Sequence, residues 1–226
     1  MKASVIKRLL LNKGITHLYH VNTVVTSLTY INNGGLLSRG DVVDLNLPQT
    51  PQSSDDTDKA FDIFYDIFFD SDDIHERAMR INYYGAVTFK YSVDVLDAFE
   101  DCDILITKDN PIRWEHSMSF DELYFTTETE ICFGFSKGEF PKHITIKKPH
   151  RIVPFHFLEE IIIDEPYDIS NEQYQIALST LQNTLLEYGY SDIPLVTREC
   201  GSSCTCKDTY KNAKPGFTYY RFQTEL

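Results

Sequence analysis

Hydrophobic and polar positions change their period along the chain, and these changes predict a succession of short elements. Apolar residues at helical spacing and cap signals predict helices over residues 4–11, 21–31, 94–100 and 170–188. The last helix begins with a capping box at Ser170 and ends at Gly189. Alternating, β-rich stretches predict strands over residues 15–19, 85–91, 103–107, 124–136, 144–148 and 152–157. Many short strands with a few helices indicate an α+β protein.

The stretch between these elements over residues 45–59 is rich in proline, serine and aspartate, which predicts an exposed loop. Acidic residues continue beyond it, and nine lie between Asp55 and Glu76 among five aromatic side chains. We interpret this segment as a solvated acidic edge beside a buried aromatic stripe. A metal site is the alternative, although the segment lacks the spacing of a twelve-residue calcium loop.

Composition narrows the classes of function. The 226 residues carry a formal net charge of −13, which excludes holding a nucleic-acid backbone by bulk electrostatics over the whole surface. A small basic groove remains open, and the best candidate is the edge formed by Lys137, Lys142, His143, Lys147, Lys148, His150 and Arg151. No apolar run is long enough to span a bilayer, and no signal peptide is evident, so we expect a cytoplasmic protein with no membrane contact.

Three groups of residues could carry chemistry. Glu128 and Glu130 share one face of a predicted strand, where paired carboxylates suit acid–base work or simply face solvent. His20 ends a predicted strand and could bind a ligand or satisfy a turn. Cys200, Cys204 and Cys206 lack both a fourth ligand and C-x₂-C spacing, so we predict free thiols and no metal.

Three blocks of this sequence, taken in order, resemble the DarT-like ADP-ribosyltransferases, a family of toxins that modify nucleic acids. The first block reads LYHV at residues 18–21 and INNGGLLSR at residues 31–39. The second reads DIHE at residues 73–76 and YGAVTF at residues 84–89, and the third reads EICFG at residues 130–134. The resemblance covers residues 15–157.

This resemblance implies an ADP-ribosyltransferase-like fold, in which two packed small β-sheets and flanking helices surround a cleft for NAD. It implies a domain over residues 1–165, extended by a C-terminal helix and a cysteine-containing segment over residues 166–226. The residues expected to bind NAD are His20, Val21, Asn22, Gly35, Leu36, Tyr84 and Phe89. Glu130 would position the nicotinamide ribose and deprotonate the acceptor. The family's phosphate-contacting arginine is missing after the second block, where Lys90 would supply the charge.

The function implied is NAD-dependent transfer of ADP-ribose to a DNA or RNA base, in a toxin or phage-defence effector that could have an antitoxin partner. Two alternatives stay open. The acceptor could be a protein, drawn by the acidic surface, or the chain could bind NAD or a nucleotide without catalysis. A metal-dependent nuclease built on the aspartates of residues 55–73 is a more distant alternative.

Overall fold

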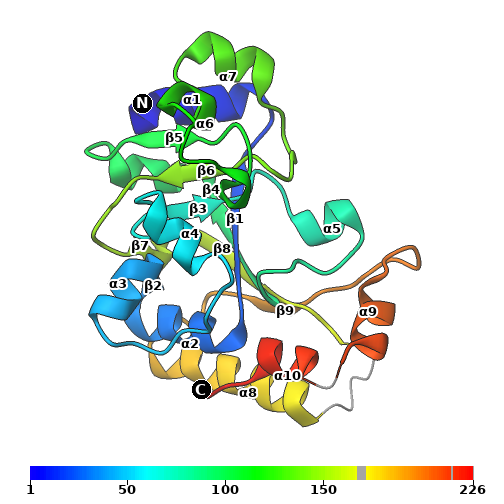
Figure 1. Cartoon of the computed structure of the whole chain (residues 1–226). Helices are drawn as coiled ribbons and strands as arrows, with labels where there is room; N and C mark the ends of the chain where they lie inside the picture. The colour runs from blue at the N-terminus through cyan, green and yellow to red at the C-terminus, as the bar shows by residue number, and fades with distance from the viewer. Residues whose placement is uncertain (167–171, 215, 226) are drawn as a thin grey trace.

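A four-stranded sheet forms the centre of the molecule in the computed structural model, which describes residues 1–166, 172–214 and 216–225 (Figure 1). Its strands run in the order β1 (His17–Asn22), β4 (Val87–Ser92), β8 (Leu158–Ile163) and β9 (Leu195–Thr197). The first three strands pair antiparallel, and β9 adds to β8 in parallel. Tyr19, Lys90 and Glu160 occupy one row across the sheet, because Tyr19 is in register with Lys90 and Lys90 with Glu160.

Two smaller sheets complete the framework. One contains β3 (Ile67–Phe69), β6 (Ile144–Ile146) and β5 (Ile104–Ile106), and the other pairs β2 (Gly35–Leu36) with β7 (Val153–Pro154). A bridge between Tyr19 and Asp70 joins β1 to the end of β3, so the three-stranded sheet adjoins the central one. The α+β class with small packed sheets is therefore confirmed.

Helices flank the sheets at both ends and on both sides (Figure 1). The α-helices are α1 (Ala3–Asn12), α2 (Val24–Asn33), α3 (Arg39–Asp44), α4 (Asp55–Ala60), α5 (Ile74–Ala78), α6 (Phe120–Leu123), α7 (Glu128–Gly134), α8 (Glu172–Glu187), α9 (Cys206–Asn212) and α10 (Phe217–Phe222). Three short 3-10 helices span Val93–Phe99, Pro111–Arg113 and Phe155–Phe157. Within the described ranges, none of these helices is long and apolar enough to cross a bilayer.

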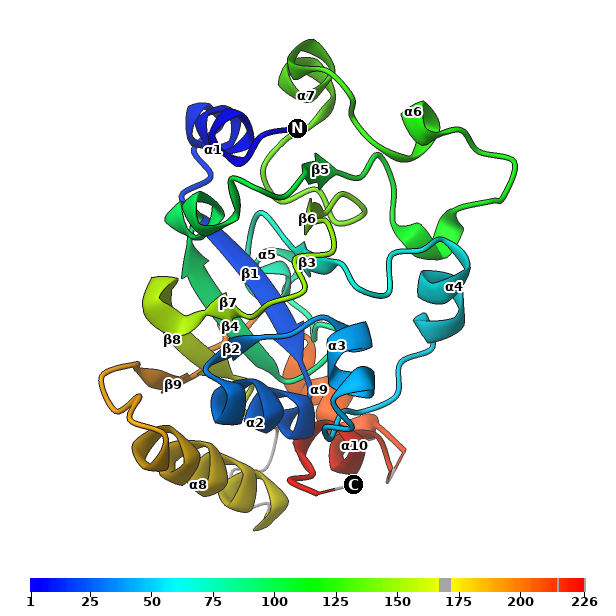
Figure 2. The same cartoon turned by 90° about the vertical axis from the view of Figure 1, so that its left-hand side faces the viewer.

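One large cluster of buried side chains forms the core. It includes Phe89 and Ile161 of the central sheet together with Ala177 and Leu181 of α8, all fully buried. Figure 2 shows α8 beside α2, and the two helices are in contact. The C-terminal segment therefore shares the core of the preceding residues. The division of the chain at residue 165 stays a prediction.

Most predicted elements are present, and the differences have local causes. The strand predicted over residues 124–136 is wrong, because residues 128–134 form α7. Thr127 caps this helix: its hydroxyl accepts from the Glu130 amide, while the Glu130 carboxylate accepts from the Thr127 amide. The predicted loop over residues 45–59 is also partly wrong, since it contains most of α4. The capping box predicted at Ser170 lies outside the described residues.

Candidate functional site

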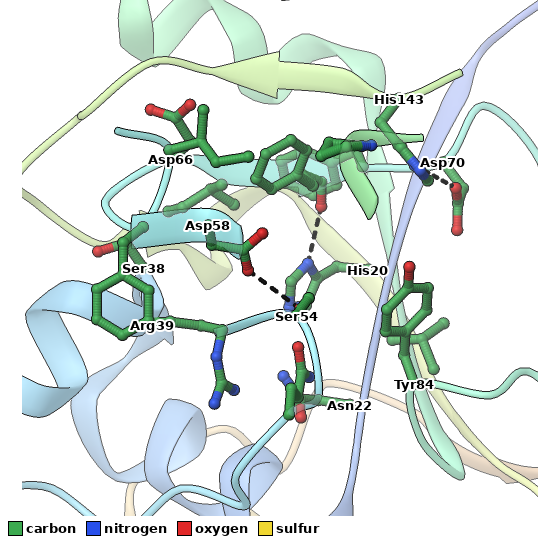
Figure 3. A pocket seen from close by; sticks show the side chains of 18 of the residues that line it. His20, Asn22, Ser38, Arg39, Ser54, Asp58, Asp66, Asp70, Tyr84 and His143 are labelled. Atoms are coloured by element: carbon green, nitrogen blue, oxygen red, sulfur yellow. Dashed lines mark hydrogen bonds and ion pairs between the residues drawn. The ribbon is translucent and has the colours of Figure 1, made fainter. Parts of the chain in front are cut away.

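A pocket with a cavity volume of about 110 Å³ opens beside β1, β3, α3 and α4 (Figure 3). Tyr19 to Asn22 of β1 form one wall, and residues 37–39, at the start of α3, form another. Asp58 of α4 and residues 66–70 around β3 close the sides, while Tyr84, Asn110 and His143 reach it from later segments. The pocket therefore gathers side chains from segments that are far apart in the sequence.

His20 is half-buried in this pocket and is a neutral hydrogen-bond acceptor there, with its Nε2 atom fully buried. Its Nδ1 lies 2.9 Å from the backbone oxygen of Phe68. A carbonyl oxygen can only accept, so Nδ1 carries the proton and Nε2 keeps a lone pair. Burial lowers the pKa of His20, which favours the neutral ring. Within the described part of the chain, Nε2 has no hydrogen-bond partner. An orphaned buried acceptor of this kind is suited to a ligand hydroxyl or amide.

Arg39 supplies the matching unpartnered donor. Its guanidinium makes a bidentate contact with Asp55, in which Nη2 lies 2.8 Å from Oδ2, and Nη2 also donates to the Thr50 carbonyl at 3.2 Å. These contacts hold the side chain in place, with only 13% of it exposed. Nη1 has no partner among the described residues. The arginine therefore retains one oriented donor and a delocalised charge, the features that recognise phosphate.

A chain of hydrogen bonds crosses the opposite side of the pocket. His143 donates from Nδ1 to Asp70 Oδ1 at 3.0 Å, and its Nε2 lies 3.3 Å from Asn110 Nδ2. Asn110 Nδ2 also lies 3.4 Å from the Tyr84 hydroxyl. The Asp70 carboxylate fixes the imidazole tautomer, so that Nε2 accepts from Asn110. This network sets the orientation of Tyr84 at the rim.

Two acids in the wall are easier to protonate than an exposed aspartate. Burial raises the pKa of Asp58 to about 6, although a hydrogen bond from the Ser54 hydroxyl opposes the shift. Burial also raises the pKa of Asp66 to about 6, against the opposing charge of Lys147. Both carboxyls therefore change charge near pH 6, above the range in which an exposed aspartate does.

The structure brings together only some of the residues expected to bind NAD. His20, Val21, Asn22 and Tyr84 line the pocket. The other three lie outside its lining and have structural surroundings. Gly35 and Leu36 pair with β7, where a side chain on Gly35 would collide with the Val153 carbonyl. Phe89 is fully buried and packs edge-on against Tyr30 with ring centroids 5.8 Å apart.

Glu130 also lies outside the pocket lining, on α7 at the top of Figure 1. Its carboxylate accepts from the Thr126 amide at 2.8 Å, the Thr126 hydroxyl at 3.0 Å and Lys108 Nζ at 2.9 Å. Lys108 and these hydrogen bonds lower its pKa to about 2. The expected position on a strand is wrong. Its catalytic role stays a prediction, and every contact described here is a capping or ion-pair contact.

Lys90 lies on β4, and its Nζ contacts Glu160 Oε1 on β8 at 2.8 Å. About a quarter of each side chain is exposed. Neither residue lines the cavity, but both share the sheet row of Tyr19, which does. Strands lie about 4.8 Å apart, so Glu160 is roughly 10 Å from Tyr19 across the sheet. Glu160 is thus a carboxylate on a strand, the position that the sequence analysis had expected for Glu130.

The predicted basic edge is largely neutralised by ion pairs. Each of these side chains has an acid within 4 Å, and the pairs are Lys137–Asp72, Lys142–Glu139, His143–Asp70, Lys147–Asp66, Lys148–Asp62, His150–Asp41 and Arg151–Asp101. A phosphate-binding edge built from these side chains would first have to break those contacts. Arg77 and Arg80 differ, since no carboxylate pairs with either one in the segments that the structure covers.

Sequence reasoning missed several residues that the fold brings together. Arg39 is the last residue of the first matched block, four residues after Gly35, so its position in that block was the available signal. Asp70 and His143 are separated by 73 positions, and no local pattern connects them. His75 is another case, because it lies beside Cys200, Cys204 and Cys206 and supplies the fourth potential ligand that the cysteine spacing lacked.

Comparison with known proteins gives structural matches only. No protein-family model matches the sequence, and no curated protein matches it significantly. Among solved structures, DarT of Thermus sp. 2.9 in complex with ADP-ribosylated single-stranded DNA is similar, with a TM-score of 0.50 and 12% identity. The match covers 87% of this chain and 97% of that chain. The same protein in complex with NAD⁺ gives 12% identity, coverage of 87% and 98%, and a TM-score of 0.48.

Proposed function

We propose that this chain, which has the fold of the DarT ADP-ribosyltransferases, transfers ADP-ribose from NAD⁺ to a base of single-stranded DNA. The observation that carries the proposal is the pair of unpartnered atoms in the pocket, His20 Nε2 and Arg39 Nη1. One is a neutral acceptor and the other a charged donor. NAD⁺ offers the complementary groups, since it carries ribose hydroxyls and a carboxamide as well as an anionic pyrophosphate.

The size of the cavity limits how much of NAD⁺ it encloses. A volume of about 110 Å³ is room for roughly four water molecules, since each occupies about 30 Å³. One end of the dinucleotide therefore fits inside, and the rest extends through the open mouth. In this arrangement His20 Nε2 accepts from a ribose hydroxyl or the carboxamide, and Arg39 Nη1 donates to the pyrophosphate. Neutral His20 avoids repulsion with the positively charged nicotinamide ring.

The reaction breaks the bond between the anomeric carbon of the ribose and the nicotinamide nitrogen. Nicotinamide leaves with the electron pair, and the ribose develops oxocarbenium character that a nearby carboxylate stabilises. A nitrogen or oxygen of the DNA base forms the new bond, and its proton passes to a base on the protein. Glu130 is the carboxylate implied by the resemblance, and Glu160 is a second candidate because of its place on β8 beside Lys90.

An aromatic and cationic surface beside the pocket suits the acceptor strand. Tyr83 is 71% exposed, and the Arg80 guanidinium carbon lies 5.6 Å from the centre of its ring. Tyr84, the next residue, lines the pocket. Bases of single-stranded DNA stack on such side chains without dependence on sequence, at about 1–3 kcal/mol per base. This contact does not need a basic surface overall, which reconciles the acceptor with the net charge of −13.

The test is incubation with labelled NAD⁺ and separate pools of single-stranded DNA, duplex DNA, RNA and protein. We expect label on single-stranded DNA, lost with Arg39→Gln, and a raised KM for DNA with Tyr83→Ala. Glu130→Gln and Glu160→Gln, run side by side, identify the catalytic carboxylate as the one whose loss abolishes transfer. Label on protein alone would support the protein-acceptor alternative, and bound but intact NAD⁺ would support the non-catalytic one.

We further propose a toxin or phage-defence role, as the sequence resemblance implies.

A further inference from the structure

Three cysteines and one histidine meet on the side of the molecule that carries α5 and α9, at the right of Figure 1. His75 comes from α5, Cys206 begins α9, and Cys200 and Cys204 lie in the segment before it. Their potential ligand atoms all lie within 4.8 Å of one another. Each cysteine is a free thiol. None of these residues belongs to the pocket described above.

The distances match a tetrahedral metal site. His75 Nε2 lies 3.5 Å from the sulfurs of both Cys200 and Cys204, and the Cys200 and Cys206 sulfurs are 3.4 Å apart. Zinc bonds of about 2.3 Å to sulfur and about 2.0 Å to nitrogen place tetrahedral ligands about 3.8 Å apart for two sulfurs and about 3.5 Å for sulfur and nitrogen. A disulfide would instead need sulfurs at about 2.0 Å.

The surroundings of His75 point its free nitrogen at the sulfurs. The side chain is only 1% exposed, and its Nδ1 lies 2.9 Å from Asp164 Oδ1. The contact lacks hydrogen-bond geometry, but the nearby carboxylate, which can only accept, favours the proton on Nδ1 and leaves the lone pair on Nε2. Carboxylates orient metal-binding histidines in this way. Asp164 is itself held, since Arg198 Nε donates to it at 2.8 Å and the Tyr210 hydroxyl at 2.9 Å.

We propose that His75, Cys200, Cys204 and Cys206 bind one structural zinc ion. Three thiolates and one imidazole are a donor set that zinc prefers over harder divalent ions. Each thiol releases its proton to solvent as it binds, so three protons leave per zinc ion. All four positions are filled by protein, which leaves none for a substrate. The site is therefore structural, and it is independent of the function proposed above.

The zinc would tie the C-terminal segment to the segment that leads into the pocket rim. His75 lies 125 positions before Cys200, and the Thr205 amide donates to the Met79 carbonyl at 2.8 Å. The chain then continues from Met79 to Tyr84, which lines the pocket. Fixing α5 to the cysteine segment restricts the segment from Met79 to Tyr84 at its start. Loss of the zinc ion is expected to make that segment more mobile.

The experiment measures bound metal in the full-length protein, purified under reducing conditions from zinc-supplemented cells and desalted. We expect about one zinc per chain, falling more than tenfold with Cys204→Ser. Cys132→Ser is the matched control, because Cys132 is exposed on α7 and should leave the metal content unchanged. A second measurement needs no variant: cobalt added to the zinc-free protein should give the visible bands of tetrahedral cobalt and thiolate charge transfer.

Several outcomes would overturn the proposal. One is wild-type protein without zinc that also fails to bind added zinc or cobalt in titration. Another is a disulfide between any two of the three cysteines in non-reduced peptide mapping of the freshly purified protein. A third is metal that is retained in Cys204→Ser and lost in Cys132→Ser.

Discussion

Replacing Arg39 by glutamine should weaken NAD⁺ binding more than any other single change at the pocket rim. The side chain is only 13% exposed, and its contacts to Asp55 and Thr50 fix it before a ligand arrives. Its unpartnered Nη1 can therefore donate to a phosphate oxygen without a further loss of side-chain freedom. Glutamine removes the charge and the fork geometry while keeping a polar side chain.

The expected magnitude follows from the type of contact. A hydrogen bond that involves a charged group contributes about 1.5–3 kcal/mol. Since 1.4 kcal/mol is a factor of ten, the Kd should rise about 10- to 150-fold. Calorimetric titration with carba-NAD⁺ measures this without turnover. The Kd of Arg39→Lys should lie between those of the wild type and Arg39→Gln, because lysine keeps the charge but not the planar donors.

Two controls separate binding from folding. Arg113→Gln removes an arginine that is 67% exposed and lies next to the pocket residue Ile112, so the Kd should change less than about twofold. Asp55→Asn weakens the contact that positions Arg39 while keeping the guanidinium. A Kd for Arg39→Gln within twofold of the wild-type value, in a variant with unchanged Tm, would show that Arg39 does not bind the phosphates of NAD⁺.

Three further predictions concern stability. The pKa of Asp58 in the folded protein is raised to about 6, so its charged form destabilises the fold above that pH, and this penalty disappears as the pH falls towards 4. Asp58→Asn should therefore stabilise the protein more at pH 7.5 than at pH 5 in urea titrations. An equal effect at both pH values would contradict the raised pKa. Thr127→Ala removes the cap of α7 and should lower the free energy of unfolding by about 1 kcal/mol in urea titrations, whereas an unchanged free energy would show that the cap is dispensable. Arg221→Met leaves the buried carbonyls of Asn82 and Gly85 without their donor and should cost about 3 kcal/mol, measured the same way; a loss below 1 kcal/mol would indicate that water replaces the guanidinium.

Individual strands could be predicted where the sequence alternates locally, as for β4 of the central sheet and β6 of the three-stranded sheet, whereas β8 and β9 of the central sheet lie in no predicted strand. Residues 85–91 and 144–148 combine β-branched and aromatic side chains with alternation, and β4 and β6 lie there. The helix α7 shows the opposite case. Its residues also alternate, but Thr127 and Glu130 stand at capping-box spacing, and that local signal prevailed over the period-two pattern.

The candidate site was predictable where its residues lie in the matched sequence blocks, as for the contiguous residues on β1 and for Tyr84 in the second block. His20, Val21 and Asn22 are neighbours on β1, so the first matched block located them together. The remaining parts depend on contacts between distant positions. Asp70 meets His143 across 73 residues, and His75 meets Cys200 across 125. No spacing rule connects such pairs, since the packing of the sheets decides which segments meet.

Covalent transfer of ADP-ribose to DNA can be measured by mass spectrometry of the acceptor oligonucleotide. The wild-type protein and Arg39→Gln would each be incubated with NAD⁺ and a short single-stranded oligonucleotide of mixed sequence. We expect the wild type to add one ADP-ribosyl unit to a base and to release an equal amount of nicotinamide, while Arg39→Gln adds little. An oligonucleotide of unchanged mass, with NAD⁺ intact in the presence of folded wild-type protein, would contradict the proposed transfer.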